Sequence, residues 1–149
     1  MSWLNYYEEP ITLHSGDKSH WKIDGDELFD DEEIRGEVIS YWARMITHYY
    51  KHRTKNPRIF GIPRGGTKWA EELARNIPGA VLLNEYEDAE YVEPTFLIDD
   101  VATTGSSFDK YPNEPRYVVV RRLSTGNMPH VQGAFMDIHL PLVTKADAE

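Results

Sequence analysis

The residues best suited to chemistry stand together in the second half of the chain. Two adjacent carboxylates, Asp99 and Asp100, follow the apolar run 95–98, and a turn of small residues comes next. Carboxylates at a strand end can accept hydrogen bonds from a sugar diol, while backbone N–H groups and hydroxyls in the turn can surround a phosphate dianion. A glycine there permits close backbone approach to the ligand. The segment predicts a sugar phosphate site, and the alternative is an acidic turn followed by a capped helix. The turn consists of Thr103, Thr104, Gly105, Ser106 and Ser107.

A second glycine-rich turn follows an earlier strand pattern at 58–62. It contains Arg64, Gly65 and Gly66. An arginine can pair bidentately with phosphate oxygens, and glycines let backbone amides turn towards an anion. Taken alone, this turn is better interpreted as a tight strand-to-helix connection with a surface arginine. Its position upstream of the sugar phosphate turn reverses that preference.

The surrounding pattern predicts the elements that position these two turns. Apolar residues recur at helical spacing from Asp30 to Tyr50 and again over 67–76, which predicts two helices. Strands that are apolar on both faces and alternate with helices are typical of a parallel sheet covered by helices. In such sheets ligands bind beyond the carboxyl ends of the strands, where both turns are expected. The predicted strands are 58–62, 80–83, 95–98, 117–120 and a last one at about 135–140.

Three further segments are expected to be irregular. The stretch from Ile11 to Asp24 is polar and predicts a loop or a short ribbon. The acidic segment from Glu85 to Glu93 predicts a surface loop. A short helix can follow Ser107, and Pro112 and Pro115 would end it early.

Length and composition bound the remaining possibilities. The chain has 149 residues, 40% of them hydrophobic, and this length and composition predict a single domain over 1–149. A formal charge of -9 argues against a nucleic acid partner, and no apolar run approaches the roughly 20 residues that span a membrane. The chain lacks cysteine, so it has no thiolate metal site, and its histidines show no metal-ligand pattern. We therefore expect a cytoplasmic protein without a metal site built from its own side chains.

With these residues identified, the chain resembles the type I phosphoribosyltransferases, whose signature is a hydrophobic strand, two acidic residues and a Thr-Thr-Gly-Ser type loop. The resemblance implies that Asp99 and Asp100 hold the ribose hydroxyls of phosphoribosyl pyrophosphate and that the residues 103–107 wrap its 5'-phosphate. It implies that the turn with Arg64, Gly65 and Gly66 binds pyrophosphate, and that Mg²⁺ accompanies this substrate. The implied fold is a single α/β domain, a mostly parallel twisted sheet flanked by helices, with a small N-terminal hood at 1–28 and a frayed tail at 141–149. Members of the family are commonly homodimers.

The N-terminal part of the chain narrows the resemblance. The segment from Ile11 to Asp24 is similar to the Thr-Leu-x-Ser-Gly-x-x-Ser segment of orotate phosphoribosyltransferases, which contributes to the base-binding hood. The resemblance implies that Lys18 reaches the base and that Arg122 meets the base carboxylate. Both roles make chemical sense because orotate is an anion. The alternatives are a solvated surface lysine and an arginine at a strand end.

One segment departs from the orotate pattern. Orotate enzymes carry a long basic loop between the second and third apolar runs, whereas the corresponding segment here, Glu85 to Glu93, is short and acidic. A basic lid would stabilise the charge that develops on pyrophosphate. Two hypotheses follow: an orotate-like phosphoribosyltransferase, favoured by Lys18 and Arg122, or a non-catalytic binding or regulatory module, favoured by the acidic segment.

Overall fold

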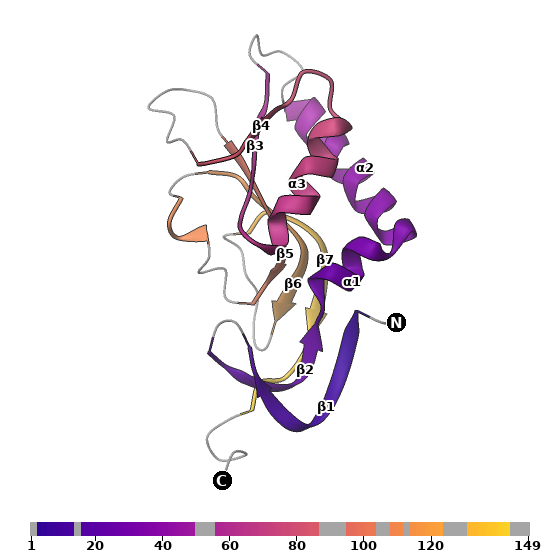
Figure 1. Cartoon of the computed structure of the whole chain (residues 1–149), viewed down its shortest axis with the longest axis vertical. Coiled ribbons are helices and arrows are strands. Elements are labelled where there is room, and N and C mark those ends of the chain that lie inside the picture. Colours follow the sequence, from indigo (N-terminus) through magenta and orange to yellow (C-terminus); the bar gives the residue numbers. More distant parts are fainter. Residues whose placement is uncertain are drawn as a thin grey trace.

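Five parallel strands form the central sheet of this computed structural model, and an antiparallel hairpin lies at one end of it (Figure 1). The structure describes residues 3–13, 16–49, 56–86, 95–103, 108–111, 114–123 and 131–143. The sheet order is β4-β3-β5-β6-β7, which confirms the predicted α/β class. The strands are β1 (Leu4–Thr12), β2 (Lys18–Ile23), β3 (Arg58–Gly61), β4 (Val81–Leu83), β5 (Thr95–Ala102), β6 (Arg116–Leu123) and β7 (Gly133–His139). The helices are α1 (Gly25–Asp30), α2 (Glu32–Tyr49) and α3 (Gly65–Arg75).

The helix that the pattern starts at Asp30 is in fact preceded by a separate short helix, α1. The break falls at Asp31, whose backbone is extended. Its carboxylate accepts a hydrogen bond from the backbone N–H of Ile34 at 3.1 Å and so starts α2. Asp24 caps α1 in the same way, with its carboxylate 3.0 Å from the N–H of Asp26. The predicted helix start was therefore wrong. Asp31 resembled a residue of the first helical turn, but it ends α1 and caps the start of α2.

The segment predicted as a loop or short ribbon forms one strand and part of another in the β1–β2 hairpin. Leu4 pairs with Ile23 and Thr12 with Lys18, with a register shift between Tyr6 and Ile11. The middle of β1 is exposed on both faces, so its sequence shows no alternation from which a strand could be predicted. In Figure 1 the arrowheads of β6 and β7 point towards this hairpin. The hairpin therefore lies at the carboxyl edge of the sheet.

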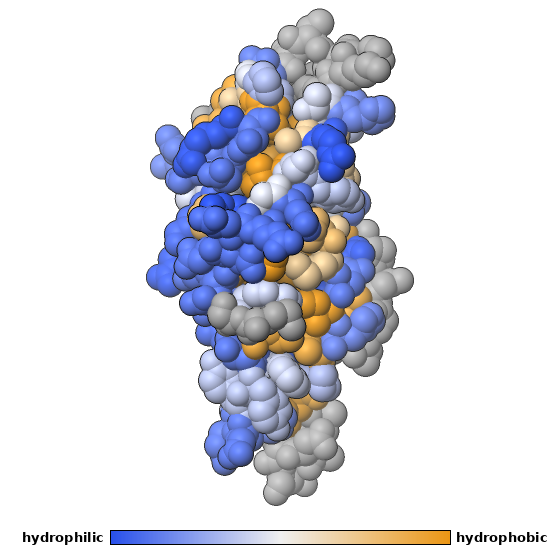
Figure 2. Space-filling view, turned by 90° about the vertical axis from the view of Figure 1, so that its right-hand side faces the viewer, coloured by the Kyte–Doolittle hydropathy of each residue, from blue (hydrophilic) through white to orange (hydrophobic). Residues whose placement is uncertain are grey.

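The helices cover one face of the sheet. Trp42 from α2 and Trp69 from α3 are fully buried on that face, with ring centroids 6.0 Å apart. The Trp42 indole N–H donates to the carbonyl of Gly133 at 3.0 Å, which ties α2 to β7. Figure 2 views the molecule from the side on which α1 and α2 lie, and hydrophilic residues cover much of that surface with hydrophobic patches between them.

The opposite face of the sheet carries a second apolar cluster. Phe60, Leu97 and Val118 are its central members, and the turn at Phe108–Tyr111 packs over them. This turn occupies the place where the sequence allowed a short helix, and Tyr111 N–H donates to the Phe108 carbonyl at 3.0 Å. Both faces of the central strands are thus buried, as their continuous apolar runs predicted.

No helix among the described residues is long and apolar enough to cross a membrane.

Candidate functional site

The turn at 61–66 and the Asp99–Asp100 pair meet where the order of the strands reverses. After β3 the chain adds β4 on one side of the sheet, and then returns to place β5 on the other side of β3. Gly61 pairs with Ile98, and the Ile62 N–H donates to the Ile98 carbonyl at 2.8 Å. In open parallel sheets, ligands bind in the crevice outside the carboxyl ends of the strands at such a reversal. The segments 61–66 and 99–103 therefore flank the expected binding crevice.

Two glycines let the turn at 61–66 fold tightly against β5. A Cβ at Gly61 would lie 2.5 Å from the Gly66 carbonyl oxygen, and a Cβ at Gly66 would overlap the carbonyl of Ile98. The Gly66 N–H donates to the Ile62 carbonyl at 2.8 Å, which closes the turn. The sequence places glycine there because the helix must start within contact distance of the neighbouring strand.

The paired aspartates lie within β5 rather than beyond its end. We predicted a strand that ends at Ile98, but β5 continues to Ala102 because Asp99 pairs with Val118 of β6 and the later residues follow. Asp99 is 7% exposed, and its carboxylate accepts the N–H of Asp100 at 2.8 Å. Asp100 is half-buried, and its carboxylate accepts the N–H of Val101 at 2.7 Å. Each acid is thus held by the backbone of the next residue.

The Asp100 carboxylate also contacts the start of α3. A Cβ at Gly65 would lie 2.5 Å from its Cγ. The structure therefore brings Asp99, Asp100, Gly65 and Gly66 together, and Arg64 adjoins them with an exposed side chain. Thr103 follows β5 and is half-buried. Thr104, Gly105, Ser106 and Ser107 lie outside the described residues.

Arg122 is held inside the protein rather than presented at a surface. The residue is 2% exposed. Its Nη1 donates to the Trp21 carbonyl at 2.7 Å and its Nη2 to Ser19 Oγ at 2.6 Å, while the third nitrogen, Nε, has no partner among the described residues. Burial lowers the pKa of Arg122, and the charge of Asp17 opposes that shift. In this structure the predicted base-contacting arginine fastens the β1–β2 hairpin to β6.

Lys18 occupies a different place on the same hairpin. It begins β2 and its side chain is exposed. Neighbouring side chains on a strand point to opposite faces, and Ser19 points to Arg122, so Lys18 projects from the other face of β2. The structure therefore does not bring the Lys18 and Arg122 side chains to one point.

Ser19 is the functional candidate that our sequence interpretation missed. It is fully buried, and its hydroxyl accepts from Arg122 and from the Trp21 N–H at 3.0 Å while donating to the Pro141 carbonyl at 2.9 Å. The signal was present, because Ser19 is the last serine of the Thr-Leu-x-Ser-Gly-x-x-Ser pattern. The pattern gave no partner for it, since the partners are distant in sequence.

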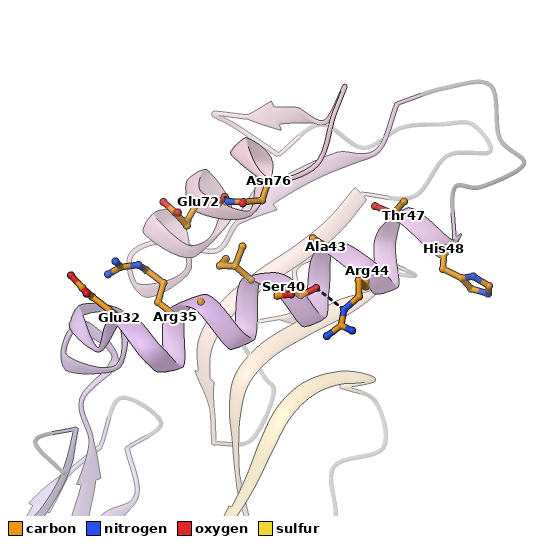
Figure 3. Close-up of a pocket in the computed structure, with 11 residues that line it drawn as sticks. Glu32, Arg35, Ser40, Ala43, Arg44, Thr47, His48, Glu72 and Asn76 are labelled. Carbon is orange, nitrogen blue, oxygen red and sulfur yellow. Dashed lines mark hydrogen bonds between the residues drawn. The ribbon is translucent and has the colours of Figure 1, made fainter.

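A large cavity lies away from this crevice. It is an open groove of about 1010 Å³ between α2 and α3, and Arg35, Ser40 and Arg44 line it from α2 (Figure 3). Glu72 of α3 and Asn76, which directly follows α3, also line it. None of the predicted site residues lines the groove, so its size does not change the choice of site.

Comparison with known proteins supports the same architecture. Neither a protein-family model nor a curated protein sequence matches the chain. Orotate phosphoribosyltransferase from Aeropyrum pernix has 19% identity and a TM-score of 0.66 over 91% of this chain and 89% of its own. UMP synthase from Leishmania donovani has 21% identity and a TM-score of 0.64 over 92% of this chain and 34% of its own.

A third solved structure contains ligands. Adenine phosphoribosyltransferase from Trypanosoma brucei, in complex with AMP, pyrophosphate and ribose-5-phosphate, has 14% identity and a TM-score of 0.57. The match covers 91% of this chain and 77% of that one. The strand order, the hairpin at the carboxyl edge and these likenesses together show that the chain has the type I phosphoribosyltransferase fold.

Proposed function

We propose that this protein is a phosphoribosyltransferase that transfers the 5-phosphoribosyl group from phosphoribosyl pyrophosphate to a small orotate-like nitrogenous base and releases pyrophosphate. The observation that carries the proposal is the meeting of two motifs at the strand reversal. The Asp99–Asp100 pair contacts the glycine turn at 61–66, so a ligand with a diol between two phosphate groups would reach both. The solved structures with the same fold include orotate and adenine phosphoribosyltransferases.

The proposed reaction asks for positioning and charge rather than for a protein nucleophile. A ring nitrogen of the base forms a bond to the anomeric carbon while the bond from that carbon to pyrophosphate breaks. Asp99 and Asp100 would hold the ribose hydroxyls, and the turn of 103–107 would hold the 5'-phosphate. Arg64 would pair with the departing pyrophosphate, whose negative charge increases in the transition state. Holding the two reactants in line would supply much of the acceleration.

Mg²⁺ is proposed to accompany pyrophosphate. Among the residues that the structure describes, no three histidine or acidic side chains gather as a metal site. The adjacent Asp99 and Asp100 fit an ion that is held chiefly by substrate oxygens and water, with one carboxylate helping, as Mg²⁺ prefers. When bound, the ion would neutralise charge on the pyrophosphate.

The second candidate function is a non-catalytic binding or regulatory module. The acidic segment from Glu85 to Glu93 favours it, and only Glu85 and Tyr86 of that segment fall within the described residues. The inward hydrogen bonds of Arg122 favour it as well, since a guanidinium bound to the hairpin is not free for a base carboxylate.

Two measurements separate the candidates. Calorimetric titration with phosphoribosyl pyrophosphate and Mg²⁺ tests the site, and a pyrophosphate release assay with a panel of bases that includes orotate tests the reaction. We expect binding and release with orotate. Binding without release for every base would support the module, and absence of binding would overturn both.

The role of Lys18 has a matched control on the same strand. Lys18 and Lys22 are both exposed on β2 and four residues apart, so they share a face of the hairpin. Lys18→Ala is expected to raise the KM for orotate at least about tenfold, the cost of one charge-assisted hydrogen bond. Lys22→Ala is expected to leave it within about twofold. Equal effects would show that Lys18 does not contact the base.

The resemblance also leads us to propose a homodimer in the cytoplasm. Sedimentation velocity with and without phosphoribosyl pyrophosphate tests the oligomeric state. A monomer under both conditions would contradict the proposed homodimer.

A further inference from the structure

The side chain of Asp100 lies against two glycines that come from different parts of the chain. Gly25 begins α1, directly after the hairpin, and Gly65 begins α3. A Cβ at Gly25 would lie 2.7 Å from Asp100 Cγ and would overlap its Oδ2. A Cβ at Gly65 would meet the same carboxylate, 2.5 Å from Cγ. The carboxylate thus occupies the volume that two absent methyl groups leave free.

The space, and not the backbone conformation, explains the glycine at position 25. Gly16 and Gly79 have positive φ, but Gly25 does not, so its backbone does not require a residue without a side chain. The first turn of a helix normally favours other residues, and glycine there carries an entropic cost. Gly36 in α2 offers a contrast, since a Cβ there would meet nothing within 4 Å. The distinguishing feature of Gly25 is the carboxylate beside it.

The position of Asp100 makes this contact important for ligand binding. Its Oδ1 is held by the N–H of Val101, so the direction of the side chain is fixed at one oxygen and at the glycine contacts. Asp100 is half-buried whereas Asp99 is 7% exposed, so Asp100 is the more accessible acid of the pair. The three atoms nearest to a methyl group at position 25 all belong to the Asp100 side chain, so the methyl group would push the accessible carboxylate away from its place.

We propose that Gly25 is a positioning residue for the sugar site: it lets the exit of the β1–β2 hairpin close against Asp100 and sets where that carboxylate meets a ribose hydroxyl. This inference rests on the proposed function for its ligand and on the glycine contacts for its geometry. The hairpin therefore helps to build the sugar site as well as the expected base site. Gly25 acts through Asp100 and does not itself touch the ligand.

The ligand experiment compares ribose 5-phosphate with inorganic phosphate by calorimetric titration. Gly25→Ala is expected to weaken the binding of ribose 5-phosphate at least about tenfold, which corresponds to the loss of one hydrogen bond to a charged group. Inorganic phosphate has no hydroxyls for Asp100 to hold, so its affinity should stay within about twofold. Gly36→Ala should change neither affinity. Equal losses for both probes, or no loss for ribose 5-phosphate, would overturn the inference.

A second experiment needs no ligand. Unfolding equilibria are measured for the wild type, Gly25→Ala, Asp100→Ala and the double variant. Because the added methyl group is opposed by the Asp100 carboxylate, Gly25→Ala should cost less when residue 100 is alanine, with a coupling of at least about twofold in the unfolding equilibrium constant. Additive effects would overturn the contact. If the wild type binds no ribose 5-phosphate, the proposed function fails, and this cycle still decides whether Gly25 positions Asp100.

Discussion

Removing the Ser19 hydroxyl should loosen the hairpin from the sheet. Ser19 Oγ is the acceptor for the Arg122 guanidinium at 2.6 Å and the donor to the Pro141 carbonyl at 2.9 Å. Arg122 already has one buried nitrogen without a described partner, so Ser19→Ala would leave a second nitrogen, Nη2, without one. The bond to the charged group is worth about 1.5–3 kcal/mol and the bond to Pro141 about 1 kcal/mol, so we expect a loss of about 3 kcal/mol in the free energy of unfolding.

The assay is urea unfolding, with Ser40→Ala as the matched control. Ser40 lies exposed on α2, where alanine is the better helix former, so this change should be neutral or stabilising by about 0.5 kcal/mol. Because the loosened hairpin carries Lys18, Ser19→Ala should also raise the KM for the base more than it lowers kcat.

A variant without the Arg122 guanidinium tests how much of this loss comes from the Ser19–Arg122 hydrogen bond. Arg122→Met replaces a buried cation by an apolar side chain of similar length, and such replacements of buried charges are often neutral or stabilising. In that background Ser19→Ala should cost about 1 kcal/mol, because the hydroxyl no longer serves a charged donor. A loss below about 1 kcal/mol for Ser19→Ala in the wild type, or the same loss in both backgrounds, would refute the reasoning.

Three further predictions concern other parts of the fold. The Arg121 guanidinium on β6 pairs with the Asp137 carboxylate on β7 and lowers the pKa of that carboxyl from its ordinary 3.8. The ion pair therefore stabilises the folded state above about pH 4, and this stabilisation is lost as the pH falls through the lowered pKa. Unfolding at pH 7 and pH 3 should show a smaller pH effect in Asp137→Asn than in the wild type, by up to about 1 kcal/mol for this partly exposed pair. Burial raises the pKa of Tyr117 to about 12, so the neutral phenol contributes stability that is fully present below pH 10 and is lost between about pH 10 and 12. Tyr117→Phe should lack this alkaline loss of stability in unfolding experiments, and an unchanged loss would contradict the assignment to Tyr117. Gly66→Ala would drive a methyl group into the Ile98 carbonyl, so we expect a loss of at least about 2 kcal/mol and weakened binding of phosphoribosyl pyrophosphate, whereas a stable variant with normal affinity would show that the turn is not held there.

The central strands could be predicted from the sequence because burial on both faces leaves a direct signal. Phe96 faces one apolar cluster and Leu97 the other, so the run through Ile98 is apolar at every position. The proximity of the turn at 61–66 and the Asp99–Asp100 pair followed from the same pattern, since parallel strands bring their carboxyl ends to one edge. The extension of β5 to Ala102 could not be predicted, because Asp99 pairs through its backbone.

The hairpin and its contacts could not be predicted from the sequence, for different reasons. The middle of β1 is exposed on both faces, so neither period nor burial marks it. The environment of Arg122 depends on partners 101 and 103 residues away, and no local pattern records such pairs. The requirement for glycine at position 25 has the same origin, since it arises from Asp100. The roles of Asp99, Asp100, Lys18 and the turn 103–107 stay predictions until a ligand is bound.

The long-range hydrogen bonds of Ser19 have a consequence for the order of folding. Its donor and acceptor partners lie 103 and 122 residues further along the chain, and closing such large loops is slow and entropically costly. During synthesis, the hairpin cannot acquire its anchor until β6 and the segment around Pro141 have left the ribosome. The hairpin should therefore be among the last parts to dock, after the helices and the first strands have formed.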